Sequence, residues 1–85
     1  DDIGYLADNM CMSKSTLYRK MKALTGLSTN EYVRKIKMQH AERLLLEGRY
    51  NISEVAFRVG INSVVYFRQC FKEEFGVLPS EYLKQ

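Results

Sequence analysis

Residues 52–76 have the sequence ISEVAFRVGINSVVYFRQCFKEEFG, and this stretch decides the fold. Apolar residues recur at helical spacing before Gly60 and again after Ser63. Such spacing predicts two amphipathic helices, separated by a tight turn that the glycine permits. Gly76 predicts the end of the second helix. Two helices joined by so short a turn form a helix-turn-helix unit.

The same pattern occurs earlier, beginning with IGYLADNMCMSKSTLYRKMKALTG at 3–26. The match continues beyond each glycine, so residues 3–34 and 52–84 form an internal repeat. The offset between the copies is 49 positions in the first helix and 50 from Ser13 onward, because Asn62 adds one residue to the second turn. Matching pairs include Leu6 and Val55, Ala7 and Ala56, Leu17 and Phe67, Met21 and Phe71, Lys22 and Lys72, and Gly26 and Gly76. We therefore predict two helix-turn-helix units in one chain, each with its own helix for contacting DNA.

The whole pattern predicts an all-α chain in which a long linker helix joins two helix-turn-helix subdomains. We expect helices over about 2–10, 13–25, 28–47, 52–59 and 63–75, then a short helix that begins at Pro79. This gives three segments, with a first unit at 1–27, the linker helix at 28–48, and the second unit with the C-terminal helix at 49–85. The predicted inward-facing residues are Leu17, Met21 and Leu24, then Tyr32, Val33, Ile36, Ala41, Leu44 and Leu45, and finally Phe67, Phe71 and Phe75. Capping-box patterns begin at Ser28 and Asn51.

The length of the linker helix suits a protein that contacts two turns of DNA. At 1.5 Å per residue, about 18 residues span roughly 27 Å. With side chains and turns added, the helix could hold two recognition helices near one DNA turn apart, about 34 Å. One chain could then contact two successive major-groove segments, at a site that need not be palindromic.

Basic residues are concentrated in one part of the chain. The formal net charge is only +3, yet residues 14–37 contain seven basic side chains and one acidic side chain. The remaining 61 residues carry six basic and nine acidic side chains. A local basic surface on a balanced body is typical of proteins that bind polyanions.

The outward faces of the two recognition helices supply the candidate DNA contacts. They are Lys14, Ser15, Tyr18, Arg19 and Lys22 in the first unit, and Asn62, Ser63, Val64, Val65, Arg68, Gln69 and Lys72 in the second. Arginine and glutamine can bind guanine and adenine edges through two hydrogen bonds, and valine can contact the thymine methyl. Two alternatives stay open. The two lysines, Lys22 and Lys72, could be ordinary solvated side chains, and the valine pair could be packing residues.

Other classes of function have little support. Cys11, Cys70 and His40 are too few and too scattered for a zinc site, so we expect reduced thiols and no cofactor. The sequence contains no catalytic Ser/His/Asp or Cys/His constellation and no Gly-rich phosphate loop, which argues against an enzyme and against a small-molecule ligand in this domain. A helical protein-interaction module that has lost DNA binding is the main alternative, supported by the apolar Val64–Val65 pair.

The sequence resembles the AraC/XylS-type DNA-binding domain over nearly its whole length. The strongest motifs are ISEVA at 52–56, VGI at 59–61, YF at 66–67, FK at 71–72, FG at 75–76 and PSEY at 79–82. The first half matches through Met12-Ser13, Leu17, Arg19, Lys22 and Gly26, and the linker through Tyr32-Val33, Ala41 and Leu44-Leu45. The resemblance implies a sequence-specific, double-stranded-DNA-binding domain of a bacterial transcription regulator, usually an activator.

The resemblance also implies a larger parent protein. A sensing or dimerisation domain would lie elsewhere in that chain, RNA polymerase is a candidate partner, and the domain would act in the cytoplasm even if the parent were membrane-anchored. The runs SKSTLYRKMKALTG at 13–26 and LLLEGRYNIS at 44–53 are most similar to output domains of hybrid two-component regulators. The chain departs from the family pattern at Gln69, where a basic residue is common, and at Leu78, where a capping Ser or Thr is common.

Overall fold

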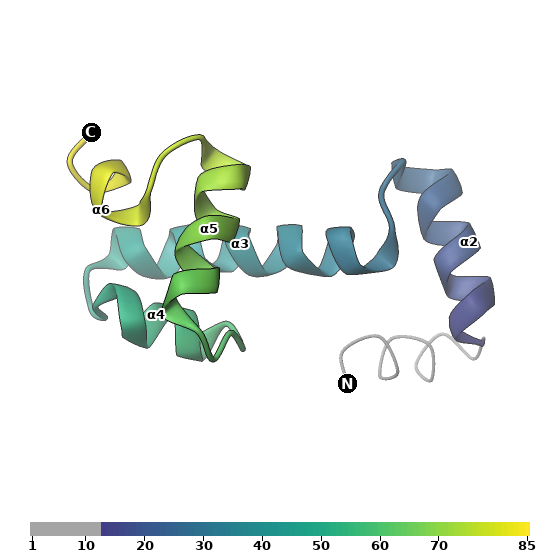
Figure 1. The fold of residues 1–85 in the computed structure, drawn as a ribbon, viewed down its shortest axis with the longest axis horizontal. Helices are drawn as coiled ribbons and strands as arrows, with labels where there is room; N and C mark the ends of the chain where they lie inside the picture. Colours follow the sequence, from purple (N-terminus) through teal and green to yellow (C-terminus); the bar gives the residue numbers. More distant parts are fainter. Residues whose placement is uncertain (1–12) are drawn as a thin grey trace. The chain divides into compact units, whose positions relative to one another are not determined.

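A computed structural model describes residues 13–85, and within that range every regular element is a helix (Figure 1). The five described helices are α2 (Lys14–Thr25), α3 (Thr29–Glu47), α4 (Ile52–Arg58), α5 (Val64–Phe75) and α6 (Pro79–Tyr82). The predicted all-α fold class is therefore confirmed. The helix predicted over 2–10 lies outside the described residues.

The chain divides into two compact units, residues 1–35 and 36–85. The boundary falls inside α3, so the long helix contributes residues to both units. The division into segments 1–27, 28–48 and 49–85 stays a prediction.

Local hydrogen bonds explain where three of the helices begin. The Ser13 hydroxyl accepts a hydrogen bond from the Thr16 backbone N–H (3.2 Å) at the start of α2. Ahead of α3, the Glu31 N–H donates to the Ser28 hydroxyl (3.2 Å) and the Ser28 N–H donates to the Glu31 carboxylate (3.4 Å). Asn51 and Glu54 form the same reciprocal box at α4. Each box satisfies backbone donors that a helix N-terminus would otherwise leave unpaired.

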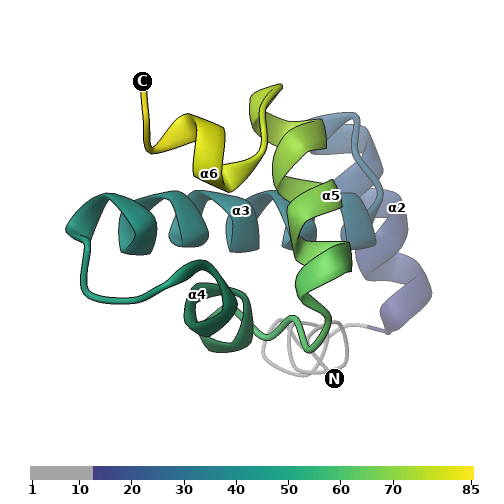
Figure 2. The ribbon, with the colours of Figure 1, turned by 60° about the vertical axis from the view of Figure 1, so that its left-hand side comes forward.

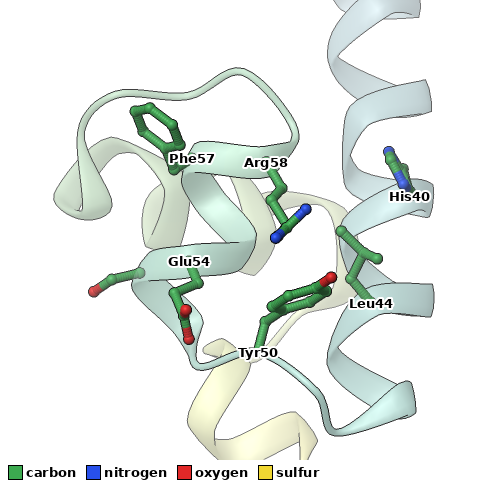
Figure 3. Close-up of a pocket in the computed structure, with 7 residues that line it drawn as sticks. His40, Leu44, Tyr50, Glu54, Phe57 and Arg58 are labelled. Carbon is green, nitrogen blue, oxygen red and sulfur yellow. The ribbon is translucent and has the colours of Figure 1, made fainter.

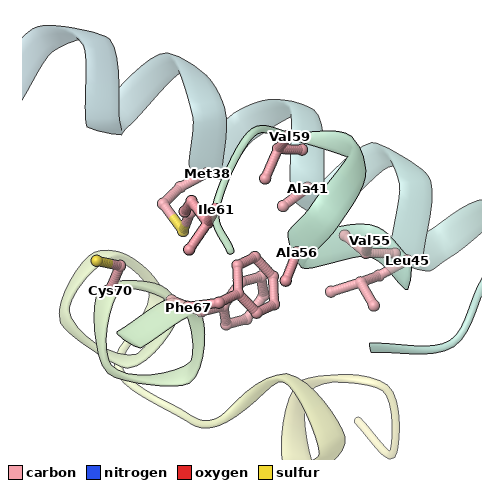
Figure 4. Close-up of a cluster of buried hydrophobic side chains, with 10 residues drawn as sticks. Met38, Ala41, Leu45, Val55, Ala56, Val59, Ile61, Phe67 and Cys70 are labelled. Atoms are coloured by element: carbon pink, nitrogen blue, oxygen red, sulfur yellow. The ribbon is translucent and has the colours of Figure 1, made fainter. Parts of the chain in front are cut away.

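The core of the unit at 36–85 lies between the C-terminal half of α3, helix α4 and helix α5 (Figure 4). Its buried residues are Met38, Ala41, Leu45, Val55, Ala56, Val59, Ile61, Phe67, Cys70 and Phe71. They come from every helix of the unit except α6, which adds the half-buried Tyr82. Burial of this apolar surface is the main stabilising contribution to such a unit.

Helix α6 is held to the unit by aromatic contacts and one hydrogen bond. The ring of Tyr82 meets Phe71 edge-on, with centroids 5.5 Å apart, and lies 5.7 Å from the ring of Phe75. Its hydroxyl donates a hydrogen bond to the Glu42 carboxylate of α3. This bond, with partial burial, raises the pKa of Tyr82. Helix α6 lacks a side-chain N-cap at Leu78, so these tertiary contacts determine its position.

Two predicted core positions are wrong. Leu24 is 83% exposed, because it lies in the last turn of α2, beyond the part of the helix that is buried at Leu17. Ile36 is 48% exposed. The buried stripe of α3 runs instead through Met38, and a residue two positions away lies about 200° around a helix.

The buried residues Met38 and Cys70 were not predicted for the core. Each lies one helical turn from a predicted core residue, Ala41 in α3 and Phe67 in α5 respectively. The Cys70 thiol is free and buried.

The contrast between Leu17 and Leu24 can be tested in one helix. Leu17→Ala removes a fully buried side chain and should lower the free energy of unfolding by about 2–5 kcal/mol. Leu24→Ala removes an exposed side chain and should change it by no more than about 0.5 kcal/mol. Denaturant unfolding followed by helical circular dichroism measures both. Equal losses would contradict the orientation of α2.

Candidate nucleic-acid interface

Helix α2 has one buried position and a broad polar surface. Leu17 is fully buried, whereas the predicted contact residues Lys14, Ser15, Tyr18, Arg19 and Lys22 are all exposed. They occupy successive turns of a 12-residue helix, with guanidinium, ammonium, phenol and hydroxyl groups among them. The structure therefore brings all five predicted residues of the first unit onto one helix, accessible to a ligand.

Helix α5 has the same orientation relative to its own core. Phe67, Cys70 and Phe71 are buried, and the predicted residues Asn62, Ser63, Val65, Arg68, Gln69 and Lys72 are exposed. Val64 is half-buried. Val65 is 74% exposed, so the alternative that it is a packing residue is wrong.

Sequence reasoning missed Tyr66, which is 48% exposed in the first turn of α5. Tyr66 has the place of Thr16 in the repeat, directly after Val65. Its aromatic character suggested part of the YF family motif rather than a surface position. The internal repeat could have indicated that position 66 is exposed, because the equivalent residue, Thr16, is polar.

The two predicted recognition helices, α2 and α5, have nearly the same backbone ends. Each has 12 residues, begins after a serine whose hydroxyl accepts from the third residue of the helix, and ends at a glycine. Gly26 has φ 75° and Gly76 has φ 82°, and their N–H groups donate to Lys22 (2.9 Å) and Lys72 (2.7 Å). Such left-handed ends favour glycine because a Cβ there is strained. The repeat is therefore present in the structure as well as in the sequence.

A short turn joins α4 to α5, the predicted recognition helix of the second unit (Figure 2). Gly60 has φ 86°, and the N–H of Ile61 donates to the Ala56 carbonyl (2.9 Å). The ammonium of Lys37 in α3 lies 3.5 Å from the point where a Cβ on Gly60 would stand. The 3.5 Å separation is an ordinary van der Waals contact, so it is the positive φ of Gly60 that favours glycine in this turn.

In the first unit, Lys22 has a structural role besides its predicted one. Its ammonium donates to the carbonyl of Gly26 (2.9 Å), which satisfies an acceptor at the end of α2. Hydrogen bonds from Ser28 are the largest cause that lowers the pKa of Glu31, with smaller contributions from Lys22 and Arg34. Basic side chains therefore lie close to the start of α3, beside the exposed face of α2.

A groove of about 630 Å³ separates that face from the start of α3. Its walls are formed by Tyr18, Arg19, Lys22 and Ala23 of α2 and by Ser28, Thr29 and Asn30. The Thr29 hydroxyl is buried and makes no hydrogen bond within the described chain. Three of the predicted contact residues thus share one concave surface.

A second groove, of about 750 Å³, lies between α3 and α4 (Figure 3). It is lined by His40, Leu44, Tyr50, Ser53, Glu54, Phe57 and Arg58. The Glu54 carboxylate is engaged by the backbone N–H of Asn51 (3.0 Å), and the Arg58 guanidinium stacks 3.9 Å above the Tyr50 ring. These contacts use the charged groups of this groove for helix capping and stacking. Among residues 13–85, no cluster of side chains has the composition of a metal site.

No described helix is long and apolar enough to cross a membrane.

A helix-turn-helix domain is the class that this fold and these exposed helices define. A family model described as a helix-turn-helix domain matches residues 6–85. The chain belongs to the AraC/XylS-type family of DNA-binding transcription regulators, and it is not an enzyme.

Solved structures agree with this assignment. The C-terminal domain of AraT, a response regulator from Geobacillus stearothermophilus, is 35% identical with a TM-score of 0.83, and the match covers 94% of this chain and 66% of that one. The DNA-binding domain of AdpA, solved in complex with a target DNA, is 33% identical with a TM-score of 0.85, covering 96% and 74% respectively.

Curated relatives are much longer than this chain. Histidine kinase P4 of Formosa agariphila is 35% identical over 95% of this chain, which corresponds to 6% of the kinase. The transcriptional activator RhaS of Mannheimia succiniciproducens is 34% identical over 89% of this chain and 28% of its own length. The chain thus spans less than a third of either relative.

The capping role of Ser63 can be tested separately from its predicted contact with DNA. Ser63→Ala removes the acceptor for the Tyr66 N–H and should lower the free energy of unfolding by about 1 kcal/mol. Ser63→Asp keeps a capping oxygen and should restore that stability, while its negative charge should weaken binding to duplex DNA. Thermal unfolding and a DNA titration at fixed salt measure the two effects. Weak DNA binding by Ser63→Ala with full stability would contradict the capping role.

Proposed function

We propose that the chain binds a specific double-stranded DNA site through two recognition helices, α2 and α5, in adjacent segments of the major groove. The observation that carries this proposal is the structural repeat of the two helices. Their cap geometry is the same, Leu17 and Phe67 are buried at equivalent positions, and their exposed faces carry different side chains. Two copies of one scaffold with different surfaces suit a single chain that contacts two different base sequences.

In the first segment, Arg19 is the proposed base contact, supported by Ser15 and Tyr18. These residues are exposed and lie within two turns of the helix N-terminus, the part of a recognition helix that meets base edges. Lys14 and Lys22 are proposed phosphate contacts, because an ammonium suits a point charge better than a planar base edge.

In the second segment, Arg68 and Gln69 are the proposed hydrogen-bonding contacts. Both are exposed, and both can bind purine edges through two hydrogen bonds. Asn62 and Ser63 precede the helix and are proposed to lie beside the DNA backbone. Lys72, about one turn beyond Arg68, is a proposed phosphate contact. The valine side chains at 64 and 65 complete this surface.

The parent protein is proposed to be a regulator in which this domain is the output module. The relatives include a histidine kinase and a response regulator, so a two-component context is supported. Activators among the relatives favour activation of transcription, with RNA polymerase as partner and a sensing or dimerisation domain elsewhere in the parent. The domain would act in the cytoplasm, where the bacterial chromosome lies. The segments 1–27, 28–48 and 49–85 are the proposed functional divisions.

Salt dependence tests the polyanion contact. Affinity for duplex DNA should fall about 10²–10⁴-fold between roughly 50 and 200 mM salt, because lysines and arginines displace condensed counterions. Lys22→Ala and Lys72→Ala should each reduce the salt slope by about one and weaken all duplexes equally. Lys22→Ala also loses the bond to Gly26, so melting curves of both variants serve as the stability control. Salt-independent binding would favour a protein-interaction module instead.

The two-helix arrangement is tested by Arg19→Ala and Arg68→Ala. Each should cost about 1–3 kcal/mol if its guanidinium binds guanine through two hydrogen bonds, and each should relax base preference in a different half of the site. Selection of bound duplexes from a random pool, followed by footprinting, measures both effects. Arg43→Ala is the matched control, because Arg43 is exposed on α3 and belongs to neither recognition helix. Loss of protection over the same bases in both variants would overturn the arrangement.

A further inference from the structure

The first turn of α5 presents an apolar surface to solvent. Val65 is 74% exposed, Tyr66 is 48% exposed, and Val64 is half-buried. The equivalent residues of α2 are Lys14, Ser15 and Thr16, all polar. The two recognition helices therefore differ in chemistry over the turn that lies nearest to base edges in helix-turn-helix proteins.

This apolar surface is not part of the core. Helix α5 buries Phe67, Cys70 and Phe71 on the side opposite Val65, and the half-buried Val64 lies at the edge of that buried side. Figure 4 shows Phe67 among the other core side chains. Val65 precedes Phe67 by two positions, which places it about 200° away around the helix. The orientation that buries the phenylalanine therefore keeps the valine in solvent.

The major groove offers one apolar group that such a surface could contact. Among the four bases, only thymine carries a methyl, at C5, and this methyl projects into the major groove. Contact with a valine side chain would remove apolar surface of both partners from water. Valine is stiff at χ1, so it would lose little side-chain entropy on contact.

We propose that the second recognition helix selects DNA by the C5 methyl group, with Val65 as the main contact. Val64 and Tyr66 flank this contact and exclude water from it. The ligand is a duplex with thymine, or with 5-methylcytosine, which carries the same methyl at the same ring position. This inference rests on the proposed function. It adds that α5 discriminates between bases by the C5 methyl group, whereas α2 does not.

Removal of one methyl group at a time from the DNA tests the proposal. A duplex selected by the 85-residue chain is resynthesised with each thymine replaced, one at a time, by deoxyuridine, which lacks only the methyl. We expect about a fourfold loss of affinity at one or two positions within the segment protected by α5, the size expected for one buried methyl group. Replacement of cytosine by 5-methylcytosine, in a duplex with cytosine at that position, should restore a similar factor.

The protein side of the test uses Val65→Ala, with Leu46→Ala as the matched control, because Leu46 is an exposed apolar residue of α3 and belongs to neither recognition helix. Val65→Ala should bind the thymine and deoxyuridine duplexes equally, whereas Leu46→Ala should keep the full difference. Both residues are exposed, so melting temperatures should stay close to that of the wild type. Footprints with Arg68→Ala identify the segment that α5 protects.

Two results would overturn the inference while leaving DNA binding intact. One is equal affinity of the wild-type chain for every thymine and deoxyuridine duplex. The other is a difference between these duplexes that persists in Val65→Ala. Failure of the proposed function itself would look different, since no duplex would then be selected from the random pool.

Discussion

The burial of Phe67 and Phe71 fixes the rotation of α5 about its own axis. Both rings are fully buried, and Phe71 also contacts Phe75 and Tyr82 at centroid distances of 4.4 and 5.5 Å. A rotation that exposed either ring would forfeit several kcal/mol of apolar burial. The exposed side chains of α5 are therefore those that remain when the phenylalanine stripe is buried. Positions on this surface can change without affecting the core, which is what a family of regulators with different DNA sites requires.

The ends of the recognition helices impose a second constraint. Helices α2 and α5 each begin after a serine N-cap and end at a glycine in the left-handed conformation. Between these fixed ends, the outward-facing positions differ almost completely, as Ser15 and Val65 illustrate. Conformation and surface chemistry are thus encoded by separate residues. This separation lets one backbone unit serve twice in a chain while each copy presents its own side chains.

Local patterns predicted most of the fold. Caps at Ser13, Ser28 and Asn51 depend on contacts three residues apart, so the sequence contains all the information that they need. Core membership depends on partners far away in the chain, and there the predictions were weaker. Ile36 and Met38 are both apolar residues of α3, and only the packing of α4 and α5 decides which of their faces is buried. The candidate interface was predicted in the same local way, from residues left outside the stripes, and Tyr66 was missed because its ring is apolar enough to belong to either side.

Charge and apolar surface are distributed unequally between the two recognition helices. Residues 14–37 hold seven of the 13 basic side chains, whereas α5 combines Arg68 and Lys72 with Glu73 and Glu74 in its last two turns. Attraction to phosphate is long-ranged and independent of sequence, but contact with a methyl group is short-ranged and depends on the base. On the proposed function, α2 and the start of α3 therefore contribute most of the salt-dependent affinity, while α5 contributes little attraction and a larger share of the discrimination. A chain built in this way can associate with any duplex through its first unit, and its residence time at a given site then depends on whether the surface of α5 fits the bases that it meets.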